Sequence, residues 1–167
     1  MANTFTKIAT VTVGSGGASS IDFSSIPSTY TDISLLISGR GSSGGTRDLL
    51  VAFNGSSTSF TCRYIYGNGS TVTSSTATTW QAEINSVTTT TNTFGNAALY
   101  IPNYAGSTNK SISSDSVTET NAATGVITWL SAGLWSNTAA INQITLTLDT
   151  GTFVQYSTAT LYGIKNS

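Results

Sequence analysis

The chain has 167 residues, of which only 8% are charged, and its formal net charge is −1. Soluble domains carry about 25% charged residues, and here Ser and Thr, about a third of the chain, replace most of them. This composition excludes a basic nucleic-acid-binding surface and a long apolar helix that spans a membrane, while 10% aromatic residues argue against disorder. The first residues have neither a basic nor an apolar region, so we expect no secretory signal.

Strands are expected along the whole chain, because β-branched and aromatic residues outnumber good helix formers. Period-two alternation recurs at 33–38, at 49–53, where Leu49, Val51 and Phe53 alternate with Leu50 and Ala52, and at 144–149, where one face is apolar and the other polar. In chain order, the expected strands are 7–13, 33–38, 49–53, 61–66, 97–101, 110–118, 125–134, 144–149 and 158–164.

Turn-forming residues separate these segments, among them Asn54-Gly55 and the glycine-rich stretch 41–45. We therefore predict an all-β fold, an antiparallel, jelly-roll-like β-sandwich of about eight or nine strands, with a barrel as the alternative. Residues 1–167 are expected to form a single domain. The Ser/Thr-rich stretch 70–92 is expected as an extended hairpin, or as a loop that reaches a neighbouring subunit.

The residues for catalysis and metal binding are scarce. The chain has no histidine, and its one cysteine, Cys62, is expected to be buried and can form neither an internal disulfide nor a zinc cluster. The glycine-rich segment 39–46 lacks the Gly-Lys-Ser/Thr ending of a phosphate-binding loop. Asp115 and Glu119 are both at odd positions of one expected strand and could share a face, as the two carboxylates of a glycosidase do. We interpret them instead as solvated carboxylates. We expect no enzymatic activity, metal or cofactor.

Aromatic and arginine residues are the remaining candidates for contacts. Trp129 and Trp135 are expected in the core, whereas Trp80 lies in the Thr-rich stretch and is predicted to be an exposed subunit or ligand contact. The arginines lie near carboxylates in a chain poor in charge, so we expect specific pairs. The candidate subunit or ligand contacts are Trp80, Tyr64, Tyr66, Tyr104, Arg40, Arg47 and Arg63.

Several segments together resemble a family of small virion structural proteins of tailed bacteriophages, including cyanophages. They are 21–35, 49–55, 64–70, 99–104, 133–136, 144–146 and 153–163. The resemblance covers most of the chain, from about residue 21 to residue 164, and it contains no catalytic signature.

This resemblance implies a β-sandwich or jelly-roll protein on the outside of a particle. We expect a capsid cement or decoration protein, a homotrimer that binds the major capsid protein on the outer capsid surface and stabilises the head. The chain would be made in the host cytoplasm and located in the virion, without nucleic-acid or membrane partners. The alternative is a tail fibre or spike component, a receptor-binding module that binds tail proteins or recognises host-surface carbohydrate.

Overall fold

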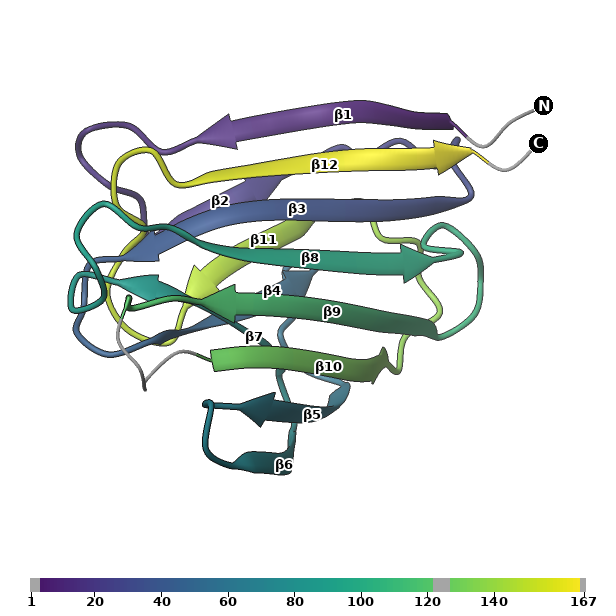
Figure 1. Cartoon of the computed structure of the whole chain (residues 1–167). Helices are drawn as coiled ribbons and strands as arrows, with labels where there is room; N and C mark the ends of the chain where they lie inside the picture. The colour runs from purple at the N-terminus through teal and green to yellow at the C-terminus, as the bar shows by residue number, and fades with distance from the viewer. Residues whose placement is uncertain (1–3, 122–126, 166–167) are drawn as a thin grey trace.

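The computed structural model describes residues 4–121 and 127–165. These residues form twelve β-strands and no helix, which confirms the all-β prediction. The strands are linked into one mixed, mostly antiparallel sheet (Figure 1). No helix long and apolar enough to cross a membrane occurs in the part of the chain that the structure describes.

Two runs of hydrogen-bonded strands make up this sheet. The longer run has the spatial order β1-β12-β3-β8-β9-β10-β5-β6, and every neighbouring pair in it is antiparallel. Its strands are β1 (Thr4–Thr12), β3 (Asp32–Gly41), β5 (Phe60–Gly67), β6 (Val72–Ala77), β8 (Gly95–Pro102), β9 (Lys110–Thr118), β10 (Ile127–Trp135) and β12 (Thr158–Lys165).

The shorter run is antiparallel as well, with the order β2-β11-β4-β7. A short parallel pairing of Arg40 and Gly41 in β3 with Asn85 and Ser86 in β7 connects the two runs. The strands of the shorter run are β2 (Ser20–Phe23), β4 (Arg47–Phe53), β7 (Trp80–Ser86) and β11 (Ile144–Leu148).

Buried apolar residues from both runs form one hydrophobic core, and the shorter run is seen behind the longer in Figure 1. Buried and exposed positions alternate along the whole length of β9. Because successive side chains of a strand point to opposite faces, one face of β9 is covered and the other is open. β7 crosses the covered side of the longer run. There the Glu83 N–H donates to Ser116 Oγ at 2.9 Å, and Ser131 Oγ donates to the Gln81 carbonyl at 2.8 Å.

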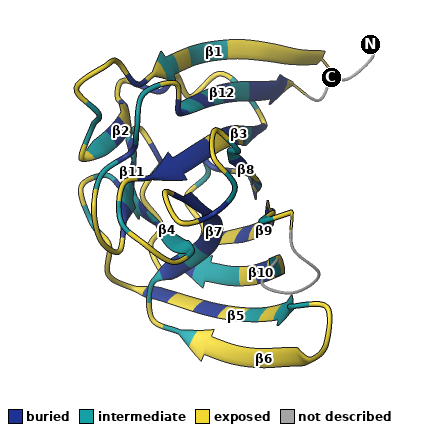
Figure 2. Cartoon of the chain, turned by 60° about the vertical axis from the view of Figure 1, so that its left-hand side comes forward, coloured by how far each residue is buried: buried dark blue, intermediate teal, exposed yellow. Residues whose placement is uncertain are grey.

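All nine expected strands are present, but the predicted number of eight or nine is too low, because β2, β6 and β7 were not predicted as separate strands. Both β6 and β7 lack a period-two pattern. β7 is buried at nearly every position and β6 is exposed at nearly every position (Figure 2). Residues 125 and 126 of the expected strand 125–134 lie outside the described residues.

The stretch 70–92 contains β6 and β7, which do not pair with each other. β6 forms a hairpin with β5, whereas β7 pairs with β4 and β3. The stretch is therefore shared between the two runs of the sheet and is not one hairpin of its own. The Asn54-Gly55 turn forms as predicted, with φ angles of 51° and 76° and a hydrogen bond of 2.9 Å from the Phe53 N–H to the Ser56 carbonyl.

Candidate functional site

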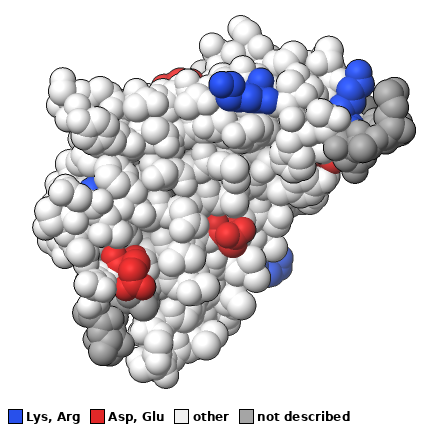
Figure 3. All heavy atoms as spheres, turned by 45° about the horizontal axis from the view of Figure 1, so that its top comes forward, with Lys and Arg blue, Asp and Glu red and all other residues white. Residues whose placement is uncertain are grey.

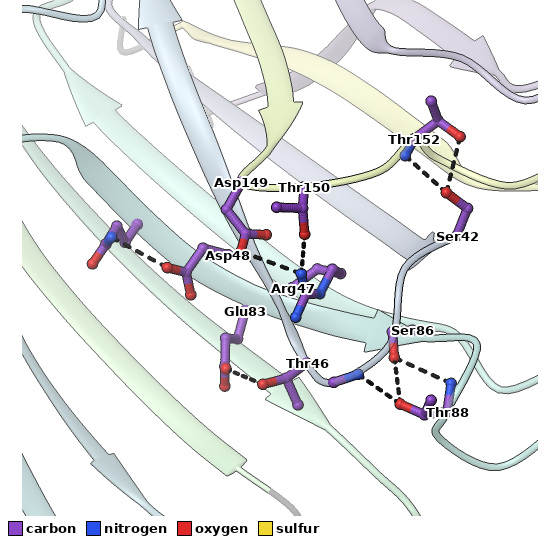
Figure 4. Close-up of polar contacts among 12 residues, drawn as sticks. Ser42, Thr46, Arg47, Asp48, Glu83, Ser86, Thr88, Asp149, Thr150 and Thr152 are labelled. Carbon is purple, nitrogen blue, oxygen red and sulfur yellow. Dashed lines mark hydrogen bonds and ion pairs between the residues drawn. The ribbon is translucent and has the colours of Figure 1, made fainter.

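Charged side chains gather around Arg47 at the beginning of β4 (Figure 4). Arg47 Nη1 lies 3.3 Å from Asp149 Oδ2 and also donates to Thr150 Oγ1. On the neighbouring strand β7, Glu83 Oε1 accepts a hydrogen bond of 2.5 Å from Thr46 Oγ1. These contacts connect β4 to β7 and to the turn that follows β11.

Two carboxylates of this group, Asp48 and Glu83, lie directly opposite each other on β4 and β7. Burial raises the pKa of Asp48, and the charge of Asp149 adds to this effect, against the opposing charge of Arg47. Burial also raises the pKa of Glu83, although the hydrogen bond from Thr46 opposes the shift. Glu83 is only 5% exposed, so neither a substrate nor solvent reaches its carboxylate freely.

The chemistry open to this group is limited. No set of three or more His, Cys, Asp or Glu side chains in the described residues is arranged to hold a metal ion. Asp115 is exposed on β9, while Glu119 follows the end of that strand and accepts hydrogen bonds of 2.9 Å from the N–H groups of Thr120 and Asn121. We therefore interpret the Arg47 group as a structural connection between strands.

Arg40 is buried, and it donates to backbone and threonine oxygens in place of the predicted pairing with a carboxylate. Its Nη1 donates to the carbonyls of Thr90 and Thr93 at 2.8 and 2.7 Å, and to Thr89 Oγ1 at 3.3 Å. Burial lowers the pKa of Arg40 from its usual value. The guanidinium therefore holds the segment between β7 and β8 and is not available to a partner.

Two of the predicted contact residues are also in the interior. Trp80 and Tyr104 are completely buried, so the prediction that Trp80 is exposed is wrong. The Trp80 ring packs against Gly133 of β10, where an added Cβ would lie 2.6 Å from its Cζ3 atom. The Tyr104 hydroxyl donates to the Pro27 carbonyl.

Tyr64 and Tyr66 stack with Trp129 on the covered side of β5 and β10. Their ring centroids lie 4.3 and 5.3 Å from that of Trp129, whose Nε1 donates to Ser131 Oγ at 2.6 Å. Trp129 is 5% exposed and Trp135 is 1% exposed, which confirms their predicted burial. Cys62 is buried as predicted. Of these three stacked rings, only those of the two tyrosines are partly accessible.

Arg63 is the one predicted contact residue that lies on an open surface. It belongs to the outer face, the name used here for the uncovered side of β3, β8, β9, β10, β5 and β6. Cross-strand pairing arranges this face in three rows. They are Ser38-Asn96-Val117-Thr128-Gly67-Val72, Leu36-Ala98-Asp115-Leu130-Ile65-Ser74 and Ser34-Tyr100-Ser113-Ala132-Arg63-Thr76.

The outer face is rich in apolar side chains and poor in charge. Its exposed charged residues are Arg63 and Asp115, and the charged groups visible in Figure 3 are isolated spots on an uncharged surface. None of its residues is buried. Six large apolar residues on it are between 37% and 78% exposed: Leu36, Ile65, Val72, Tyr100, Val117 and Leu130.

Leu130 separates two hollows on the outer face. The larger hollow, of about 570 Å³, lies between β10, β5 and β6 and is lined by Arg63, Ile65 and Leu130, among others. The smaller one, of about 130 Å³, lies on the other side and is lined by Tyr100 and Asp115. The surface is therefore not flat around its centre.

Sequence reasoning did not identify this apolar face, although one signal was present. In a strand with one solvated face the outward positions are expected to be polar, yet Leu36 and Leu130 occupy such positions next to buried Leu35 and Trp129. Apolar residues on both sides of a strand indicate a second surface that can be covered.

Comparisons of the chain with known proteins found no related sequence or structure. No family model, no curated protein and no solved structure matches this chain. The function is therefore inferred from the outer face and from the closed interior.

Proposed function

We propose that this chain is a non-enzymatic structural protein of a tailed-bacteriophage virion, a capsid cement or decoration protein that packs against other protein subunits. The observation that carries the proposal is the outer face, with its six exposed large apolar side chains and only two exposed charges. Large exposed apolar patches on soluble proteins mark interaction surfaces. Covering this one desolvates few charges, which is otherwise a large cost of association.

The proposed fold is a jelly-roll-like β-sandwich, with the shorter run of strands as one layer and the longer run as the other. The contacts of Trp80 with Gly133, and the hydrogen bond between Glu83 and Ser116, support this interpretation. Such a scaffold presents one side of a broad layer to a partner and keeps the other side for the core.

The proposed assembly is a homotrimer on the outer capsid surface, with the major capsid protein as partner. Added buried area between capsid subunits would then resist internal pressure. We expect mass spectrometry of separated heads and tails to find the chain in heads, in a fixed ratio to the capsid protein. Its presence in tails and absence from heads would refute this assignment.

A pair of variants tests whether the outer face makes the capsid contact. Leu130→Asp introduces a charge at the centre of the outer face, whereas Val87→Asp introduces it at another exposed apolar residue outside that face. We expect Leu130→Asp to abolish binding to capsids that lack the protein and Val87→Asp to leave it unchanged. Equal binding by both variants would show that the outer face is not the capsid contact.

One observation favours the second candidate, a tail fibre or spike module that binds carbohydrate. The hollow of about 570 Å³ is lined by the hydroxyl-bearing residues Ser74 and Thr76 together with Arg63 and Leu130. Hydroxyl and guanidinium groups beside an apolar wall suit a sugar ring. A glycan array with the wild type and Thr76→Val tests this, and no binding by the wild type at millimolar glycan would reject it.

A further inference from the structure

We propose that the outer face binds a second copy of this chain, with Arg63 of each copy against Asp115 of the other. This contact goes beyond the proposed function, which requires copies to associate but does not say through which residues. It forms between free chains, and it is distinct from the capsid contact, in which the capsid protein would cover the same outer face of a trimer.

The two charges that carry the inference are unpaired within one chain. In the part of the chain that the structure describes, the ion pair joins Arg47 and Asp149, and neither Arg63 nor Asp115 has a charged partner. Arg63 and Asp115 lie two strands apart and in adjacent rows of the outer face. With strands about 4.8 Å apart and a rise of about 3.3 Å per residue, their Cα atoms are separated by about 12 Å. Each charge is therefore free to meet a group outside the chain.

A twofold axis brings these charges together twice. In a contact of two identical faces, residue i of one copy meets residue j of the other, and j meets i. An axis that lies in the plane of the contact, crosses the line from Arg63 to Asp115 at its midpoint and is perpendicular to that line places each arginine opposite the other copy's aspartate. Midway between them on β10 are Leu130 and Ala132, one in each row. The axis therefore passes over the apolar centre of the outer face.

The shape at this centre suits a second copy. Leu130 is 52% exposed and stands between the two hollows, so the Leu130 side chains of two copies meet beside the axis. The hollows on both sides give neighbouring side chains space to enter. Ile65 adds apolar area on one side of Leu130, and Ala98 adds a small side chain on the other.

Charge favours a second copy over a partner whose contact surface has charges of one sign only. A partner of a single sign would leave either Arg63 or Asp115 buried without a counter-charge, which is strongly unfavourable. A second copy supplies both counter-charges from the same two residues. The outer face is thus complementary to itself.

The experiment uses charge reversal and mass measurement of the full chain in solution. We expect the wild type to sediment as an even multiple of the 17.2 kDa chain, and Arg63→Asp and Asp115→Arg each to halve that mass, with Kd raised at least tenfold. An equimolar mixture of the two variants should regain the larger mass. In that mixed pair the two introduced charges are opposite in sign and face each other, and the unchanged Arg63 of one chain faces the unchanged Asp115 of the other. A chain that carries both substitutions should associate like the wild type.

Lys7→Asp provides the matched control, because it makes the same charge change as Arg63→Asp on exposed β1, five strands away from β10 in the longer run, and should leave the mass unchanged. A wild-type mass that is a single chain or an odd multiple would overturn the inference. Failure of the mixture to regain the larger mass, with both variants folded by circular dichroism, would overturn it too. These outcomes are separable from the capsid proposal, since a trimer that binds capsids but never pairs refutes only the twofold contact.

Discussion

Replacing Gly133 with alanine tests how closely β7 packs against β10. The added Cβ would lie 2.6 Å from Trp80 Cζ3, and it would also meet the Thr61 carbonyl oxygen of the paired strand β5. Carbon atoms in good contact lie about 3.5–4.0 Å apart, so the buried ring or β10 must move by about 1 Å. Overpacking costs about 1–3 kcal/mol, and because a backbone oxygen cannot rotate away, we expect about 2–3 kcal/mol for Gly133→Ala.

Urea denaturation followed by tryptophan fluorescence measures this loss, and for a chain of this length it corresponds to a decrease in Tm of about 4–12 °C. Gly14→Ala is the matched control, because a Cβ at that position meets no atom within 4 Å. That substitution should be neutral, or stabilise the protein by about 0.4–1 kcal/mol, by restricting the unfolded chain. If the free energies of unfolding of Gly133→Ala and Gly14→Ala differed by less than about 0.5 kcal/mol, the close packing of Trp80 on β10 would be refuted.

Three further substitutions test the interior. Arg40→Met removes the donors to the Thr90 and Thr93 carbonyls and should cost about 2–4 kcal/mol, with faster proteolysis between β7 and β8, whereas intact resistance to protease would contradict the role of the guanidinium. The pKa of Glu83 is raised in the folded chain, so the native carboxyl holds its proton more tightly than the carboxyl of the unfolded chain. The wild type therefore loses stability as the pH rises above the usual pKa of 4.5, whereas Glu83→Gln has no carboxyl to ionise. The stability of Glu83→Gln relative to the wild type should thus increase with pH in thermal melts, and a constant difference would contradict this. Tyr104→Phe leaves the Pro27 carbonyl without its donor and should cost about 1–3 kcal/mol in urea denaturation, while a change below about 0.3 kcal/mol would show that water replaces the hydroxyl.

The sequence predicts a strand well where one side is covered and the other is open. β11 is such a strand, and its apolar residues Ile144, Leu146 and Leu148 alternate with threonines as the burial does. β7 does not alternate because it is buried at nearly every position, so polar Glu83 and Asn85 are buried beside Ile84. β6 fails for the opposite reason, since it is open on both sides. Periodicity alone cannot identify either kind of strand.

The candidate contacts were harder to predict, because the exposure of a polar or aromatic side chain depends on contacts distant in sequence. Trp80 stands among threonines, but β10 lies against it across the core. Arg40 forms no ion pair within residues 4–121 and 127–165, and it donates to carbonyls about 50 residues further along the chain. Arg63 is exposed because it lies on the outer face, where its neighbours Thr76 on β6 and Ala132 on β10 are exposed as well.

The scarcity of charge has a different meaning once the charges are located. Arg40 and Lys110 are buried and donate to backbone carbonyls, and Arg47 is paired with Asp149, so these cations stabilise the chain itself. The outer face retains one charge of each sign, on different strands and too far apart to neutralise each other. In a contact that covers apolar side chains, such a pair contributes little affinity but strongly disfavours every orientation in which like charges meet. The few remaining charges therefore determine which way two surfaces rich in hydroxyl and apolar groups fit together.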